Sequence, residues 1–425
     1  MPLTRRLLGA VLLLIVPLTT LARDLPDEVR VRLFEEVAPQ ALVVQAERGL
    51  QFFAGDGPDN VLAELAPHET ATIRIRGEDV YVQMSERSFF ALSLRVIPRD
   101  NGLLIVEVIE GTKPLGPRRY PGLLTLEVDR SSAPTLKLIN HVALEDYVAC
   151  VVAREYGFDD LEGARAMAVL ARTYTLRSAG KFGDDYDLVD HRLAQQYDGA
   201  DRLTDAATEA VRQTQGEVLM YHGELVEAVY FSSSGGHTAD NDAVWQGKPV
   251  PYLRGVSDPY DAASPHANWR TVVPRDRLLR ALSTRYDFEV EGFYIGDRSR
   301  DGRVQSIELI HRDRTARVIP SNEFRLLVNR HVGNTGLKST LFDVRRNGEH
   351  YVFEGRGFGH GVGLSQYGAL EMSRRGASYR DILTFYFTGV EVQQMDGAPT
   401  QPFVTEAPAS NPAGKATKKS RRRGW

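Results

Sequence analysis

The chain has 425 residues, of which 42% are hydrophobic and 25% charged, a composition typical of globular protein with two or three separate cores. Its net charge of −4 selects no class of partner for the chain as a whole, and no nucleic-acid partner is expected. The single cysteine, Cys150, excludes an internal disulfide and a cysteine-based metal cluster.

Residues 1–22 are predicted to be a secretory signal peptide. Arg5 and Arg6 precede a short apolar run, and Ala22 stands at the expected cleavage site. A membrane span needs roughly 20 apolar residues, and this run is shorter, although an uncleaved anchor stays open as the alternative. In either case we expect the body of the protein to be exported across the cytoplasmic membrane, into the periplasm, the cell envelope or the medium.

Residues 23–112 are predicted to form a β-rich accessory domain, in which we find no catalytic grouping. Its segments alternate between apolar and polar residues and end at Gly, Pro or Asp, as half-buried strands do. A joint rich in Pro, Gly and Arg, residues 111–119, is expected to separate this domain from the next. The predicted strands are 28–36, 41–46, 71–77, 79–84, 90–97 and 102–111.

The remainder mixes helical and strand patterns, so the predicted fold class is α+β. We expect a catalytic domain over residues 118–245 and a C-terminal part of the same region over residues 246–394. After a first helix that begins near Ala143, the predicted helices are 161–178, 204–213, 274–285, 321–330, 365–375 and 378–388, and the predicted strands are 216–221, 226–231 and 303–311.

A carboxylate interrupts the apolar face of the first helix. Apolar residues recur along this helix at the spacing of one buried face, and the position that continues their series is occupied by Glu155. Gly157, two residues later, is a natural end for the helix. Burial and the negative end of the helix dipole both disfavour a charge there. A carboxyl kept partly protonated near neutral pH is what a general acid requires. The apolar positions of the series are Leu144, Tyr147, Val148, Val151 and Val152.

The second helix is apolar on all sides, so its arginines, Arg165 and Arg172, are expected to need an anion partner. That partner is either a structural carboxylate or a polar ligand, and the sequence leaves both open. We expect Arg172 to be the neighbour of Glu155. A buried Glu–Arg pair without catalytic function would give the same pattern.

Two later segments are candidate cleft walls. Residues 232–241 form a small-residue loop around His237 that follows a predicted strand, and no G-x-S-x-G turn supports serine catalysis. Residues 355–363 alternate glycine with other residues around His360. No G-K-[ST] follows, so close approach of the backbone to a ligand or to another strand explains these glycines better than phosphate binding.

Residues 395–425 are predicted to be a disordered basic tail. Six cations lie between Lys415 and Arg423, which leaves −10 for the rest of the chain. This tail could contact anionic membrane lipid or wall polymer, and a tail that is merely solvated is the equal alternative.

Several long motifs together resemble the stage II sporulation protein D / amidase-enhancer family, over residues 119–392. They are LEDYVACVVAREYG, LEGARAMAVLARTYTL, YDLVDHRLAQQYDG, YFSSSGGHTADNDAVW and GRGFGHGVGLSQYGALEMSRRGASYRDILTFYFTGVEV. The resemblance implies a peptidoglycan lytic transglycosylase that cuts the MurNAc–GlcNAc bond of strands stripped of stem peptides and leaves 1,6-anhydro-MurNAc ends. It also implies that Glu155 is the catalytic acid.

A second function from another class stays open, a non-catalytic glycan-binding activator of an N-acetylmuramoyl-L-alanine amidase. The presence of Glu155 favours the enzyme, because a binding module needs no acid on its apolar face. A zinc amidase that uses His237 and His360 is disfavoured, since no H-x-x-E or H-E-x-x-H spacing is present.

The sequence departs from the family in one loop. Some members bind zinc there through a His and two Cys, and the matching positions here are Leu193, Val189 and Ala194. We therefore expect no metal and no other cofactor, and a loop held by packing around Gln195 and Tyr197. By the resemblance, the residues expected to line the glycan cleft, each with a purely structural role as the alternative, are Arg172, Tyr197, Ser234, His237, His360, Gln366 and Tyr367.

Overall fold

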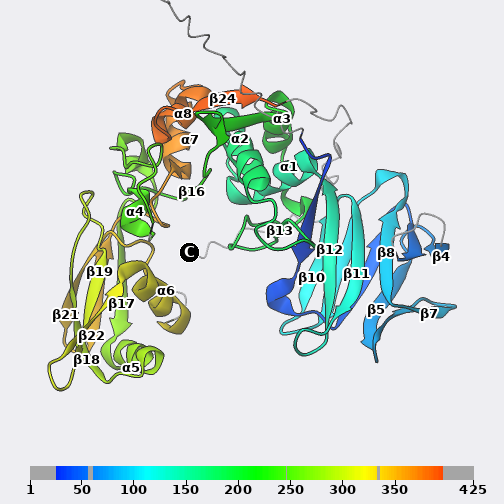
Figure 1. Ribbon diagram of the computed structural model, residues 1–425, viewed down its shortest axis with the longest axis horizontal. Helices are drawn as coiled ribbons and strands as arrows, with labels where there is room; N and C mark the ends of the chain where they lie inside the picture. Colours follow the sequence, from blue (N-terminus) through cyan, green and yellow to red (C-terminus); the bar gives the residue numbers. More distant parts are fainter. Residues whose placement is uncertain (1–24, 56–60, 246, 333–335, 396–425) are drawn as a thin grey trace, which may run out of the picture.

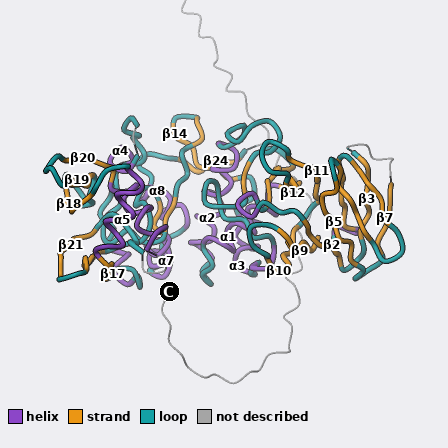
Figure 2. The backbone as a smooth tube through the Cα atoms, turned by 90° about the horizontal axis from the view of Figure 1, so that it is seen from below, coloured by secondary structure: helices purple, strands orange, loops and turns teal. Residues whose placement is uncertain are grey.

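The computed structural model of the chain describes residues 25–55, 61–245, 247–332 and 336–395. The predicted signal peptide and, apart from Met395, the predicted basic tail lie outside these residues. Within them, no helix has both the length and the apolar character needed to cross a membrane. A β-sandwich, a central helical group and a second α+β unit follow one another along the long axis, as Figures 1 and 2 show. This arrangement confirms the predicted α+β class.

The sandwich consists of two sheets, in which neighbouring strands are antiparallel except for one short parallel pair of strands in the first sheet. The first has the strand order β13-β1-β12-β11-β8-β3-β4 and the second β10-β9-β2-β5-β6-β7. The strands of the first are β1 (Glu28–Leu33), β3 (Leu50–Ala54), β4 (Val61–Leu65), β8 (Ser93–Pro98), β11 (Leu123–Asp129), β12 (Thr135–Ala143) and β13 (Leu188–Val189). Those of the second are β2 (Ala41–Ala46), β5 (Thr70–Arg76), β6 (Asp79–Gln83), β7 (Ser88–Ala91), β9 (Leu104–Glu110) and β10 (Leu115–Tyr120).

The alternating pattern located many of these strands but missed β3 and β4. The predicted strand 90–97 is interrupted at Leu92, whose side chain is 76% exposed, and its halves join different sheets as β7 and β8. The predicted domain boundary at residues 113–117 is wrong. Strand β10 pairs with β9 in the second sheet, and the strands that follow it, β11 and β12, belong to the first sheet. The β-rich unit therefore extends to Ala143.

The sandwich passes directly into the helical group. Ala143 still pairs with Glu28 across the sheet, and α1 (Leu144–Glu155) begins at the next residue. The helix α2 (Leu161–Arg177) lies at the centre and contacts α1, α3, α7 and α8, because its alanines let neighbouring helices approach closely. The other helices are α3 (Asp205–Gln213), α4 (Asn241–Val244), α7 (Gln366–Arg374) and α8 (Tyr379–Tyr386), and the short strands are β14 (Glu217–Tyr221), β15 (Glu224–Leu225), β16 (Tyr230–Phe231), β23 (Leu364–Ser365) and β24 (Glu391–Gln394).

Helix ends follow ordinary capping chemistry. A capping box of Ser378 and Asp381 starts α8. The N-cap of α2 is Asp160, whose carboxylate accepts the Gly163 N–H.

The second α+β unit is inserted between α4 and α7 and has its own core, in which Phe293, Phe324 and Phe353 pack together. Its two ends are adjacent, since the Gly357 N–H donates to the His266 carbonyl at 2.8 Å. It contains the strands β17 (Trp269–Pro274), β18 (Val290–Ile295), β19 (Ser306–His311), β20 (Ala316–Pro320), β21 (Phe342–Asn347) and β22 (His350–Gly355) and the helices α5 (Arg275–Tyr286) and α6 (Ser321–Val332).

Candidate active site

Glu155 is the last residue of α1, at a sharp break before α2. The five predicted apolar positions of α1 are all buried, which confirms the orientation inferred from their spacing. Gly157 adopts a φ of 57°, a left-handed conformation that favours glycine and ends the helix. The fold thus places one carboxyl group at the edge of the core, half-buried, at the negative end of a helix.

The carboxyl group of Glu155 is held by the loop that follows β13. Its Oε1 accepts the backbone N–H of Gln196 at 2.9 Å. Burial is the main influence on this carboxyl and raises its pKa, and the charge of Asp198 acts in the same direction. The Gln196 N–H and Arg154 act in the opposite direction, and burial outweighs them. A raised pKa with a fixed orientation suits a group that must give up a proton and take one back.

Arg172 is not the neighbour of Glu155, and this prediction was wrong. Its guanidinium is fully buried and forms a two-point ion pair with Glu145, with Nε 2.8 Å from Oε1. Its Nη1 donates to the carbonyl of Glu217 at 2.8 Å. Glu145 lies ten residues before Glu155, which is about 15 Å along the helix. Arg172 therefore anchors the start of α1 to β14 inside the core and does not line a cleft.

Glu145 was not predicted to be buried. Its position lies beside the apolar series of α1, and charged residues in a first helical turn are usually solvated. The fully apolar surroundings of Arg172 were the only sequence signal that some carboxylate had to accompany it. Of the two kinds of partner that the sequence left open for Arg172, the structure shows a structural carboxylate.

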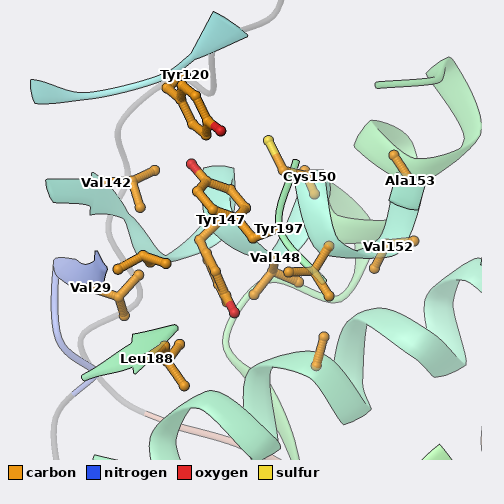
Figure 3. Packing of buried hydrophobic residues seen from close by; sticks show 14 of the residues in the cluster. Val29, Tyr120, Val142, Tyr147, Val148, Cys150, Val152, Ala153, Leu188 and Tyr197 are labelled. Atoms are coloured by element: carbon orange, nitrogen blue, oxygen red, sulfur yellow. The ribbon is translucent and has the colours of Figure 1, made fainter. Parts of the chain in front are cut away.

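Tyr197 is also a core residue. Figure 3 shows it among the buried side chains around Tyr120, Tyr147 and Val148, and its hydroxyl donates to Oδ1 of Asn140 at 2.7 Å. With no exposed surface, it cannot line a glycan cleft as predicted.

Gln195 and Tyr197 do hold the loop, as the sequence predicted. The side-chain carbonyl of Gln195 accepts the hydroxyls of Tyr147 and Thr175, and its amide donates to Tyr230. Nε2 of His191 lies 3.2 Å from a carboxylate oxygen of Glu35. In the described parts of the chain, no cluster of three His, Cys, Asp or Glu residues could hold a metal ion. The hydrogen bonds of Gln195 therefore help to position the next residue, Gln196, against Glu155.

Ser234 is buried as well and supports the loop that contains it. Its hydroxyl accepts the Gly236 N–H at 3.1 Å. The neighbouring Ser233 donates to the buried carboxylate of Asp261 at 2.7 Å, and Ser365, the N-cap of α7, donates to the same carboxylate at 3.2 Å. The predicted contact of Ser234 with a ligand is therefore wrong, and this network fixes the start of α7.

The two predicted cleft histidines lie apart from Glu155. The ring of His360 packs between Phe231 and Trp245, and burial lowers its pKa to about 4. His237 lines a separate 420 Å³ pocket with Asp240, Arg254 and others. Among the described residues, neither histidine forms a hydrogen bond or ion pair with Glu155.

The predicted reason for the glycines around His360 is confirmed at Gly363. A Cβ there would lie 2.2 Å from the Val229 carbonyl, because β16 and β23 pair side by side. Gly363 also has a φ of 79°, which other residues rarely adopt.

Gln366 and Tyr367 are the predicted residues that the fold brings to Glu155. The amide of Gln366 donates to the backbone carbonyl of Glu155 at 3.1 Å. The ring of Tyr367 packs against Phe158, in the turn after Glu155, and against His266. Sequence reasoning missed Phe158 and His266, since each stands alone in a loop with no spacing pattern around it.

Comparison with known proteins shows the family to which this chain belongs. Residues 132–221 match the family described as stage II sporulation protein, and residues 269–363 match a domain of unknown function. The chain is 30% identical to stage II sporulation protein D of Bacillus amyloliquefaciens over 71% of its own length and 88% of that protein. It is also 30% identical to stage II sporulation protein D of Bacillus subtilis, over 65% of this chain and 82% of that protein.

A second kind of relative is the amidase enhancer of Bacillus subtilis, which is 30% identical over 54% of this chain and 37% of that protein. The chain belongs to the stage II sporulation protein D / amidase-enhancer family, as its motifs indicated. The inserted α+β unit coincides with the domain of unknown function.

Proposed function

We propose that this protein is a lytic transglycosylase that cleaves the MurNAc–GlcNAc bond in peptidoglycan strands stripped of stem peptides. The observation that carries the proposal is the carboxyl of Glu155, half-buried at a helix end, with a raised pKa and one oxygen held by the Gln196 N–H. The family relationship supports the choice of cell-wall glycan as the substrate class.

The reaction needs one carboxyl group. Protonated Glu155 gives its proton to the glycosidic oxygen as the bond from that oxygen to C1 of MurNAc breaks. The C6 hydroxyl of the same MurNAc attacks C1, and the Glu155 carboxylate takes the hydroxyl proton. The products are a strand with a free GlcNAc 4-hydroxyl and a strand with a 1,6-anhydro-MurNAc end, and no water is consumed. A hydrolytic glycosidase would usually need a second carboxylate.

The alternative is a glycan-binding activator of an N-acetylmuramoyl-L-alanine amidase. The relative named amidase enhancer supports it, and a cell-wall amidase is a proposed partner on the same ground. This alternative gives no role to an acid whose pKa is raised by burial, so we place it second.

The site of action is proposed to be outside the cytoplasmic membrane. The apolar segment within residues 1–22 supports export, and peptidoglycan is an extracytoplasmic polymer. The basic residues near the C-terminus would add contact with anionic lipid or wall polymer.

The test is to incubate purified protein and a Glu155→Gln variant with amidase-stripped glycan strands and to analyse the products by mass spectrometry. Anhydro-muramyl ends from the unaltered protein alone support the lytic enzyme. Binding without cleavage by either protein, together with stimulation of an added amidase, would favour the activator.

A further inference from the structure

An aromatic strip leads away from the turn that follows Glu155. It consists of Phe158, Tyr367, His266 and Phe358, whose ring centroids lie 5.1, 5.5 and 5.0 Å apart in that order. All four side chains are partly exposed, and Phe358 is 41% exposed. The strip therefore offers apolar ring surface to a ligand beside the candidate acid, and sugar rings pack on such surfaces through their C–H faces.

A cation lies against this strip. The Lys338 ammonium is 3.0 Å from Nδ1 of His266. Burial, and secondly the Lys338 charge, lower the pKa of His266 to about 4, so the ring is neutral at neutral pH and accepts a hydrogen bond from Lys338. Among the described residues, no carboxylate lies within ion-pair distance of this ammonium. Its positive charge and its other two N–H groups are left for a ligand.

The backbone of Lys338 is held in place. Its carbonyl accepts the Gly359 N–H at 2.9 Å and lies 3.4 Å from Nη1 of Arg325, and the preceding Leu337 is buried. Arg325 is itself partly buried and, in the described part of the chain, has an amide partner, Asn322, in place of a carboxylate. The surroundings of Lys338 therefore carry excess positive charge, which favours an anionic ligand.

We propose that Lys338 and the aromatic strip form a subsite for a carboxylated sugar, namely a muramic acid residue with a free lactyl carboxylate. This inference rests on the proposed function and specifies its substrate. The lactyl group is a neutral amide while a stem peptide is attached and becomes an anion only when that peptide is removed. Lys338 would thus distinguish stripped strands from peptide-bearing ones.

The subsite gives the inserted unit a part in recognition. Lys338 and Phe358 belong to the domain of unknown function, whereas Phe158 and Tyr367 belong to the helical group that carries Glu155. The sugar would lie across the junction of the two, so the inserted unit contributes the charge and the helical group contributes the acid.

The test uses the Glu155→Gln protein, so that ligands stay intact, and two GlcNAc–MurNAc tetrasaccharides. One has free lactyl carboxylates and the other has them capped as methylamides. We expect the free acid to bind about tenfold or more tightly than the amide, as a charge-assisted hydrogen bond would give. Adding Lys338→Met should remove the difference, and Lys338→Arg should keep most of it.

Two further variants separate charge from stacking. Lys113→Met removes an exposed lysine of the sandwich and should leave the preference unchanged. Phe358→Ala should weaken binding of both tetrasaccharides by similar factors. Thermal melting of each variant shows that it is folded.

Equal binding of the two tetrasaccharides, or a preference that survives in folded Lys338→Met, would overturn the inference and leave the cleavage reaction standing. No binding of either one, with no cleavage of glycan by the unaltered protein, would overturn the inference and the proposed function together.

Discussion

The backbone N–H of Gln196 donates a hydrogen bond of 2.9 Å to Oε1 of Glu155, and this contact joins the loop after β13 to the end of α1. Within the described residues, Oε2 receives no hydrogen bond, so one oxygen is fixed and the other is left for a substrate. A general acid that acts alone needs this combination, because its orientation must persist while its proton leaves and returns.

Replacing Glu155 with Gln should abolish cleavage without weakening the fold. We expect the rate to fall by about 10²–10⁴, the usual contribution of a general acid. The Gln side-chain carbonyl can still accept the Gln196 N–H. Burial raises the pKa of Glu155 in the folded protein. As the pH rises above the pKa that this group has in the unfolded chain, the folded state therefore binds more protons than the unfolded state, and the stability of the fold falls. The variant lacks this loss, so at pH 7 its urea midpoint should equal or exceed that of the unaltered protein. A clearly lower midpoint would show that the carboxylate stabilises the fold.

The charge of Asp198 should set the pH range of activity. Asp198 pairs with Arg154 and raises the pKa of Glu155. Asp198→Asn removes the anion and leaves Arg154 uncompensated, so the pKa of Glu155 should fall. Since the protonated acid is the active form, the alkaline limb of the kcat/KM profile should move to lower pH. Asp201→Asn, which removes the nearby partner of Arg119, is the control and should leave that limb in place. A limb that moves upward in Asp198→Asn would contradict this account.

Breaking the buried pair of Arg172 and Glu145 should destabilise the whole fold. Arg172→Met leaves an unpaired buried carboxylate and should cost about 3–5 kcal/mol in the free energy of unfolding. The double variant with Glu145→Met should recover part of that loss. Arg177→Met, in a half-exposed pair on the same helix, should cost only about 0–1 kcal/mol. If Arg172→Met raised KM and left stability unchanged, a role in binding substrate would replace the structural one.

The loop after β13 should depend on Gln195 and not on a metal. Gln195→Ala leaves the Tyr147 hydroxyl without its buried acceptor and should cost about 1–3 kcal/mol, whereas Thr175 can still donate to the Ala171 carbonyl. Its rate of cleavage should fall, because Gln196 is the next residue. Prolonged dialysis against a chelator should change neither the melting temperature nor the rate. A drop in both that added zinc restores would contradict this expectation.

Local sequence patterns located Glu155 because its position is set by helical periodicity and one glycine, both of which are short-range features. Gln366 and Tyr367 came from motif resemblance and do reach the site. Arg172, Tyr197 and Ser234 came from the same motifs but are buried, because a family motif preserves packing as readily as contact with a ligand. No pattern marked Phe158, His266 or Lys338. Their relation depends on the inserted unit returning to the helical group, and such long-range contact has no local signal.

Isotope labelling tests the central claim most directly. Stripped glycan strands are cleaved in H₂¹⁸O, and the new muramyl ends are weighed by mass spectrometry. The account predicts 1,6-anhydro ends that contain no ¹⁸O, formed by the unaltered protein and not by Glu155→Gln. Reducing ends that carry ¹⁸O would show that water is the nucleophile, and would contradict a lytic mechanism with Glu155 as its single acid and base.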